Sequence, residues 1–220
     1  MNNFFVYLYI STIEIAFIAS LLSFRLNYPR HLKIFSLILG CDFLGEILSN
    51  YLLAYFGLRS NVPVYNFVML IEFLVYGIFF LMIVKRKSVR KIIVIYLILY
   101  TLFWFVSVFF VFGLWHWNSY AIIAGGLSTI CMAAFYYYQL FTAEQLQRLD
   151  KSPEFWISTG LIIFYACNMP YFGMLNVLTK NFPTLAEKQL ILLQVLNILE
   201  YSLFTYAYIC RIPIRKSLSS

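Results

Sequence analysis

Residues Val64–Val84 read VYNFVMLIEFLVYGIFFLMIV, and this segment of twenty-one residues carries a single charged side chain, Glu72. A helix needs about 20 predominantly apolar residues to cross the hydrocarbon core of a bilayer. The segment is therefore long enough to span a membrane. A carboxylate near the centre of such a helix is costly unless it has a partner or a function, so Glu72 is the first residue that needs an explanation.

The rest of the chain has the same composition. Of its 220 residues, 63% are hydrophobic, 20% are aromatic and only 11% are charged, whereas soluble domains carry about 25% charged residues. Seven apolar segments, separated by short loops, cover about 4–24, 34–56, 64–84, 92–114, 119–141, 155–178 and 189–210. We predict an all-α fold, a seven-transmembrane-helix bundle that forms a single membrane domain over residues 1–220.

The basic residues predict how these spans are oriented. Thirteen of the sixteen Lys and Arg residues lie after the first, third, fifth and seventh segments, while Arg59, Lys180 and Lys188 lie on the other side. Cytoplasmic loops carry the excess of Lys and Arg in membrane proteins. We therefore expect an N-terminus outside, a cytoplasmic C-terminus and a location in the cytoplasmic membrane.

The residue patterns that usually indicate an enzyme are missing. The four Cys residues have no paired spacing and are interpreted as small apolar residues. His31 and His116 fall on opposite sides of the predicted membrane and cannot share a metal ion. No P-loop, dinucleotide fingerprint or nucleophile-elbow motif occurs. We expect no catalytic residue and no cofactor, and no nucleic-acid partner, because the positive charge is confined to loops and span ends.

Five of the nine acidic residues fall inside the predicted spans, whereas no Lys or Arg does. The five are Glu14, Asp42, Glu46, Glu72 and Glu200. Four of them lie 11–13 residues from the nearest cytoplasmic basic residue of the same span, or about 16–20 Å at about 1.5 Å per residue. Because the hydrocarbon core is about 30 Å thick, the sequence predicts a belt of carboxyl groups near the membrane midplane.

Polar residues accompany this belt on the same helix faces. Asn197 lies one turn before Glu200, and Tyr76 lies one turn after Glu72. Asn168 precedes Pro170 in the sixth span, where we expect a kink or an unwound turn. The candidate residues for binding a ligand or ion are Glu72, Glu200, Asp42, Glu46, Glu14, Asn197, Tyr76 and Asn168.

Clustered carboxyl groups without basic partners have to be partly protonated or have to share a cation. A proton, a metal cation or an amine-bearing ligand fits such a belt, and an anion does not. The structural alternative is that protonated Glu side chains hold the bundle together through hydrogen bonds to Asn, Gln and Tyr of neighbouring helices.

Three functions fit this pattern. The first is a transporter of a cation or a small amine, with coupling to protons at the same carboxyl groups. The second is a receptor-like sensor that signals through a separate cytoplasmic protein, because every predicted loop is short. The third is an intramembrane lipid-modifying enzyme that uses a carboxyl pair as acid and base. In each case the lipid bilayer surrounds the protein.

Three known seven-span families are excluded by the residues that they require. Gln189–Cys210 has no Lys for a retinal Schiff base, the spans lack the His ligands of the progestin-receptor and ceramidase type, and the Pro-Gln signature of SWEET sugar transporters is absent. Asn61–Glu72 and Phe155–Gly160 resemble uncharacterised bacterial seven-span integral membrane proteins. This resemblance implies the fold and implies no activity.

Overall fold

The computed structural model describes residues 3–56, 60–143 and 148–211. Arg59, Arg215 and Lys216, which contributed to the predicted orientation, lie outside the described residues. The helices are α1 (Asn3–Ser20), α2 (Leu22–Arg25), α3 (Arg30–Phe56), α4 (Val62–Ile83), α5 (Lys87–Val106), α6 (Ser119–Phe141), α7 (Pro153–Asn181) and α8 (Pro183–Ile209). A π-helical turn, η1 (Ser107–Phe112), continues α5, and a short 3₁₀ helix, η2 (Leu149–Lys151), precedes α7.

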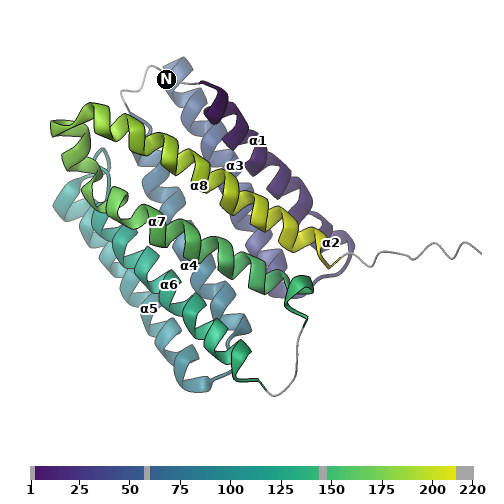
Figure 1. Cartoon of the computed structure of the whole chain (residues 1–220). Coiled ribbons are helices and arrows are strands. Elements are labelled where there is room, and N and C mark those ends of the chain that lie inside the picture. The colour runs from purple at the N-terminus through teal and green to yellow at the C-terminus, as the bar shows by residue number, and fades with distance from the viewer. Residues whose placement is uncertain (1–2, 57–59, 144–147, 212–220) are drawn as a thin grey trace, which may run out of the picture.

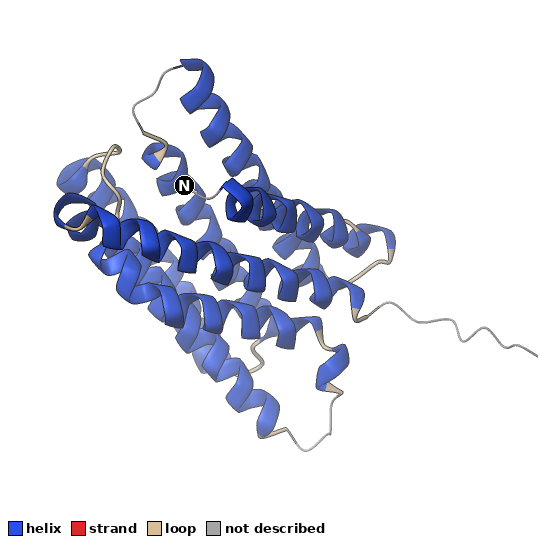
Figure 2. Ribbon diagram, turned by 45° about the horizontal axis from the view of Figure 1, so that its top comes forward, coloured by secondary structure: helices blue, strands red, loops and turns tan. Residues whose placement is uncertain are grey.

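The described residues form an all-helical protein, as the sequence predicts (Figure 2). Six helical segments are long and apolar enough to cross a membrane: Phe4–Arg25, Val62–Ile83, Lys87–Phe112, Ser119–Phe141, Pro153–Asn181 and Pro183–Ile209. The remaining long helix, α3, covers the predicted second span but is not among these six. The protein is therefore a multi-pass helical membrane protein.

Several helix ends differ from the predicted spans. The helix α8 begins at Pro183 rather than at residue 189, and α5 begins at Lys87 rather than at residue 92. Hydropathy marks only the apolar part of a helix. Pro is tolerated in the first turn of a helix and Lys is a good helix former, so both helices start before their apolar segments begin. The chain is not unwound at Pro170, because α7 continues through it as one helix. The irregular turn lies instead at η1.

Six of the long helices form a closed ring. Each contacts the next in the order α1, α3, α4, α6, α7, α8, and α8 returns to α1 (Figure 1). The helix α5 lies outside this ring and packs against α4 and α6. Side chains that point from the ring helices toward its centre therefore meet residues that are far apart in the sequence.

A glycine sets the distance between α4 and α6. A Cβ atom added at Gly125 would lie 2.4–2.5 Å from ring carbons of Phe73. The Phe73 ring is buried and packs against Tyr76, Tyr100 and Tyr165, at centroid distances of 5.3–6.2 Å. The ring of Phe73 thus occupies the space that a side chain at Gly125 would need.

Asn66, near the start of α4, holds the loop that precedes α6. Its Nδ2 donates to the carbonyl oxygens of Leu114 and His116, each at 3.0 Å, and its own carbonyl accepts a bond from Trp104 Nε1 at 3.1 Å. Asn66 is 1% exposed. This residue therefore anchors the connection between η1 and α6, where the chain is irregular.

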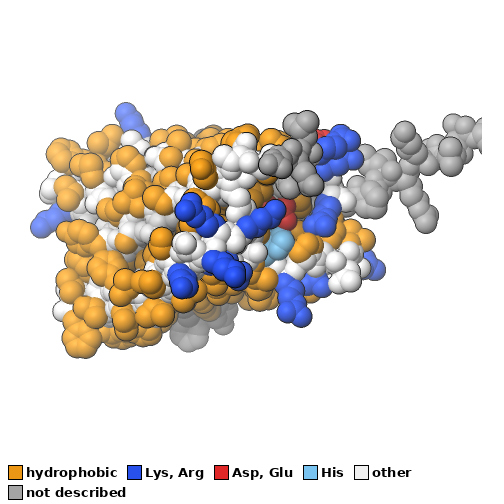
Figure 3. Space-filling model, turned by 90° about the horizontal axis from the view of Figure 1, so that it is seen from below, with side chains coloured by type: hydrophobic (Ala, Val, Ile, Leu, Met, Phe, Trp, Pro, Cys, Tyr) orange, Lys and Arg blue, Asp and Glu red, His pale blue; other side chains and the backbone are white. Residues whose placement is uncertain are grey.

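The outer surface has the pattern of a protein in contact with lipid. Large hydrophobic side chains are exposed along several of the long helices, for example Leu44, Ile98, Phe110 and Tyr138 at 58–84%. On the face seen in Figure 3, hydrophobic side chains cover most of the surface and Lys and Arg gather toward one half. The end of the bundle where α2 and α8 end and where α3, α5 and α7 begin is called the basic end below.

Replacing Gly125 with Ala tests the packing of α4 against α6. The added methyl group forces the buried Phe73 ring to move, and overpacking of this kind costs about 1–3 kcal/mol. We expect a lower melting temperature for purified Gly125→Ala in detergent. Gly173→Ala is the control, because its Cβ would meet only the terminal methyl group of Ile123, at 3.1 Å. Equal melting temperatures for the two variants would contradict this account.

Candidate functional site

Glu72 lies in the middle of α4 and binds two tyrosines. Its Oε1 accepts a hydrogen bond from the Tyr76 hydroxyl at 2.8 Å and another from the Tyr165 hydroxyl of α7 at 2.7 Å. Both tyrosines are buried, whereas Glu72 keeps some accessible surface. The two bonds hold the carboxyl group in place and connect α4 to α7 across the centre of the ring.

The two carboxyl groups of α3 are also held by tyrosines from other helices. Asp42 accepts a bond from Tyr201 of α8 at 3.1 Å. Glu46, one turn further along α3, accepts bonds from Tyr9 of α1 at 2.8 Å and from Tyr65 of α4 at 3.0 Å. These contacts link α3 to its ring neighbours α1 and α4 and, across the ring, to α8.

Glu200 of α8 is bonded differently from the other three. It is 3% exposed, and its Oε1 is buried without a hydrogen-bond partner. Its aliphatic part lies beside Gly160 of α7, where an added Cβ would be 3.6 Å from Glu200 Cγ. A buried carboxyl oxygen without a donor costs free energy, so this atom is the position where a bound cation or proton would gain most.

Asp42, Glu72 and Glu200 lie close enough for their charges to interact, and Glu46 interacts with Asp42 in the same way. We call Asp42, Glu46, Glu72 and Glu200 the carboxyl cluster. Like charges in an apolar surrounding repel strongly, so the cluster cannot be fully ionised without a cation to compensate. The arrangement is suited to holding a shared proton or a positively charged group.

The structure places the other predicted site residues at different distances from this cluster. Tyr76 belongs to it through Glu72. Asn168 is buried one turn beyond Tyr165, and its Nδ2 has no hydrogen-bond partner. Asn197 is partly exposed and donates to the Leu193 carbonyl of its own helix. Glu14 is exposed on α1, so the structure does not bring it into the cluster.

The predicted site residues leave out Tyr65, which lies two turns before Glu72 on α4 and binds Glu46. They also leave out three tyrosines on other helices that bind the carboxyl groups: Tyr9, Tyr165 and Tyr201. The chain contains 18 tyrosines, and neither position nor spacing distinguishes these three from tyrosines in the lipid-facing belts. Tyr201 follows Glu200 directly, but adjacent helix residues point in different directions. Only the packing of α8 against α3 reveals that Tyr201 reaches Asp42.

The spacing of the carboxyl groups determines which kind of cation the cluster could bind. Within residues 3–56, 60–143 and 148–211, no group of three or more His, Cys, Asp or Glu side chains is spaced to hold a metal ion. The carboxyl groups of Asp42, Glu46 and Glu72 each bind tyrosine hydroxyls instead. A proton or a single ammonium group needs fewer converging ligands and matches this arrangement.

An aromatic layer lies between the carboxyl cluster and the basic end. The Phe35 ring of α3 contacts Tyr76 and Phe79 of α4 and Phe204 of α8, with centroid distances of 5.0–5.8 Å. All four side chains are at most 1% exposed. We call Phe35, Phe79 and Phe204 the aromatic layer, and it separates the carboxyl cluster from the basic end.

An ion pair lies beyond the aromatic layer. His31 Nε2 of α3 and Glu154 Oε1 of α7 are 2.7 Å apart, and the two side chains are 15% and 18% exposed. The His31 ring also contacts Phe79, at a centroid distance of 5.9 Å. The pair therefore joins two helices of the ring directly over the aromatic layer.

Hydrogen bonds also tie α3 to α8 near this end. The Tyr208 hydroxyl donates to the Leu32 carbonyl at 2.9 Å, and Tyr28 donates to the Tyr208 carbonyl at 3.1 Å. Burial raises the pKa of the Tyr28 hydroxyl, and the Arg211 guanidinium, 5.4 Å from the ring centre, opposes this rise. The bundle is consequently closed by bonded side chains at its basic end.

The opposite side of the cluster is more polar. Tyr65, which binds Glu46, also lies 3.3 Å from Ser49 Oγ, and Asn61 Nδ2 lies 3.4 Å from the same oxygen. Tyr65 and Asn61 are both partly exposed. A line of hydroxyl, amide and carboxyl groups therefore leads from the end of the bundle opposite the basic end to the carboxyl cluster.

Comparisons with known protein families, with curated proteins and with solved structures found no match for this chain.

Proposed function

We propose that the protein is a membrane transporter that carries a small cation or amine in exchange for protons. In this proposal α3 completes a set of seven spans, and the basic end faces the cytoplasm of a cell whose cytoplasmic membrane holds the protein. The observation that carries the proposal is the buried Glu200 Oε1 without a donor, beside the carboxyl groups of Asp42 and Glu72.

A proton or an ammonium group supplies what Glu200 lacks. A proton or an ammonium group with an N–H gives the buried oxygen a hydrogen bond, and any bound cation removes part of the repulsion within the cluster. Because only one of them occupies the position at a time, binding of the cation is linked to release of a proton. The tyrosines that hold Asp42 and Glu72 limit how far these groups move, so Glu200 is the exchangeable member.

Transport requires that the cluster be accessible from one side of the membrane at a time. The two sides of the cluster differ in this way, since one is lined by polar groups and the other is closed. The polar line through Tyr65 and Asn61 leads toward one end. The aromatic layer and the His31–Glu154 pair block the other end. Opening the basic end would need α3, α7 and α8 to separate where these contacts hold them, as in alternating access.

A sensor or a lipid-modifying enzyme would use the same carboxyl cluster differently. A sensor needs ligand binding without flux, and an enzyme needs a lipid substrate at the carboxyl pair. No contact among the described residues favours either over transport. A flux assay separates them, because only the transporter moves ions through a sealed membrane.

The first test measures exchange in liposomes. The purified protein is reconstituted into vesicles with an acidic lumen and a trapped pH-sensitive dye, and Na⁺, K⁺ or choline is added outside. Choline is included because a quaternary ammonium carries no proton of its own. We expect at least one cation to alkalinise the lumen, and Glu200→Gln to slow this by on the order of tenfold or more, since hydrogen bonds to charged groups contribute about 1.5–3 kcal/mol.

Glu187→Gln is the matched control, because Glu187 is an exposed carboxyl group near the start of the same helix. It should exchange at the wild-type rate. A wild type that shows no flux, but whose melting temperature a cation raises, would contradict transport and favour the sensor. If no cation has any effect and Glu200→Gln melts at or above the wild-type temperature, the cluster only holds the helices together.

A second test concerns closure of the basic end. Glu154→Ala leaves the His31 ring without its acceptor, and losing such a partly buried bond costs about 1–3 kcal/mol. We expect faster hydrogen–deuterium exchange at the start of α3 and of α7, because local opening there becomes easier. Proton leak through the liposomes should rise as well.

Asp150→Ala provides the comparison for this variant. It removes the other ion pair found in the described residues, Arg148–Asp150, whose side chains are 73% and 55% exposed. Exposed pairs contribute about 0–1 kcal/mol, so exchange and leak should stay close to wild type. Similar changes in both variants would show that the His31–Glu154 pair has no special part in closing the bundle.

A further inference from the structure

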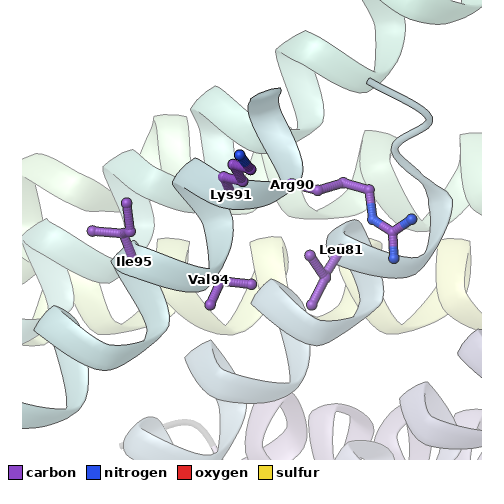
Figure 4. A pocket seen from close by; sticks show the side chains of 5 residues that line it. All are labelled: Leu81, Arg90, Lys91, Val94 and Ile95. Atoms are coloured by element: carbon purple, nitrogen blue, oxygen red, sulfur yellow. The ribbon is translucent and has the colours of Figure 1, made fainter. Parts of the chain in front are cut away.

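A groove lies between α4 and α5 near the basic end, on the outer side of the ring of six helices. It has a volume of about 420 Å³ and is lined by Leu81, Arg90, Lys91, Val94 and Ile95. Figure 4 shows Arg90 and Lys91 near the start of α5, with Leu81 on the neighbouring helix. The groove is therefore basic at one end and apolar at the other.

The groove lining continues as a stripe along α5. Val94 and Ile95 each follow a basic residue by four positions, so they lie one turn further on the same face. Ile98, Leu99 and Leu102 extend this face and are 58–59% exposed. From Arg90 to Leu102 the helix rises about 18 Å, which is close to half of the roughly 30 Å hydrocarbon core.

Among the described residues, no acidic side chain forms a salt bridge with the basic residues at this groove. Lys85, Arg86, Lys87, Arg90 and Lys91 are all exposed. The salt bridges found in the described parts of the chain, His31–Glu154 and Arg148–Asp150, include none of them. The positive charge at the start of α5 is thus available to a ligand.

The turn that carries these residues is held in place. The Lys85 backbone N–H donates to Gln139 Oε1 of α6 at 2.7 Å, and Gln139 Nε2 donates to the Ile83 carbonyl at 3.4 Å. Further along, a Cβ at Gly77 would lie 2.5 Å from Leu97 Cδ2, so α4 and α5 are in close contact there. The backbone around the groove is therefore held in place, and the protein loses little conformational entropy when a ligand binds there.

We propose that this groove binds an anionic phospholipid of the surrounding bilayer. Arg90 and Lys91 bind the phosphate of the head group, and one acyl chain lies along Val94, Ile95 and the exposed stripe of α5. The length of the stripe matches one leaflet. A soluble phosphate compound would use only the two basic residues, and an acidic peptide would leave the lipid-facing stripe uncovered. This proposal does not depend on the transport function.

Native mass spectrometry of the full-length protein in detergent tests the proposal. Phosphatidylglycerol and phosphatidylcholine with identical chains are compared, and glycerol 3-phosphate is added as a competitor without chains. A basic residue near an anionic lipid surface strengthens binding by about fivefold. We expect the wild type to prefer phosphatidylglycerol by about tenfold or more, with no competition from equal concentrations of glycerol 3-phosphate.

Three variants separate the groove from the general charge of the loop. Arg90→Gln with Lys91→Gln should lose the preference, whereas Arg86→Gln with Lys87→Gln, which removes the same charge outside the groove lining, should keep it. Val94→Phe fills the groove without changing charge and should also lose it. Equal loss in the two double variants, no loss in Val94→Phe, competition by glycerol 3-phosphate, or no preference in the wild type would each overturn the proposal.

Discussion

A carboxyl group buried among membrane helices must find a hydrogen-bond donor, and in this protein tyrosine hydroxyls from other helices provide most of them. Tyr165 reaches Glu72, Tyr201 reaches Asp42, and Tyr9 and Tyr65 reach Glu46. The helices of the ring are positioned by these bonds as well as by apolar packing. Because water does not compete inside a bilayer, each bond both satisfies a costly group and selects a helix neighbour.

Glu200 belongs to the same cluster, but its Oε1 has no tyrosine hydroxyl or other donor. A carboxyl oxygen without a donor, at 3% exposure, raises the free energy of the folded protein. Proteins retain such a group where a ligand or a proton stabilises it during function. The difference between one incompletely bonded carboxyl group and three bonded ones is the reason for proposing Glu200 as the position where a cation or proton binds.

The two sides of the cluster have different chemistry, and this suits a protein that works through changes of access. Aromatic side chains at most 1% exposed fill the side toward the basic end, while hydroxyl and amide groups occupy the other side. The aromatic layer has no polar group to hold an ion, so in the proposed transporter it would block passage until helices move. The groove proposed to bind an anionic lipid lies between α4 and α5, away from α3, α7 and α8, so a bound lipid would not obstruct the separation of those three helices.

The sequence alone predicted the membrane class, the helical fold and a set of five carboxyl groups that includes the four of the cluster, because length, hydropathy and charge are local properties of each segment. It located helix ends only where hydropathy changes, so it missed the early starts of α5 and α8 and the π-helical turn at Ser107–Phe112. Tertiary structure was needed to exclude Glu14 from the cluster and to include Tyr165 and Tyr201. The direction in which a side chain points across the bundle depends on how helices far apart in sequence pack together, and residue spacing within one helix carries no record of that packing.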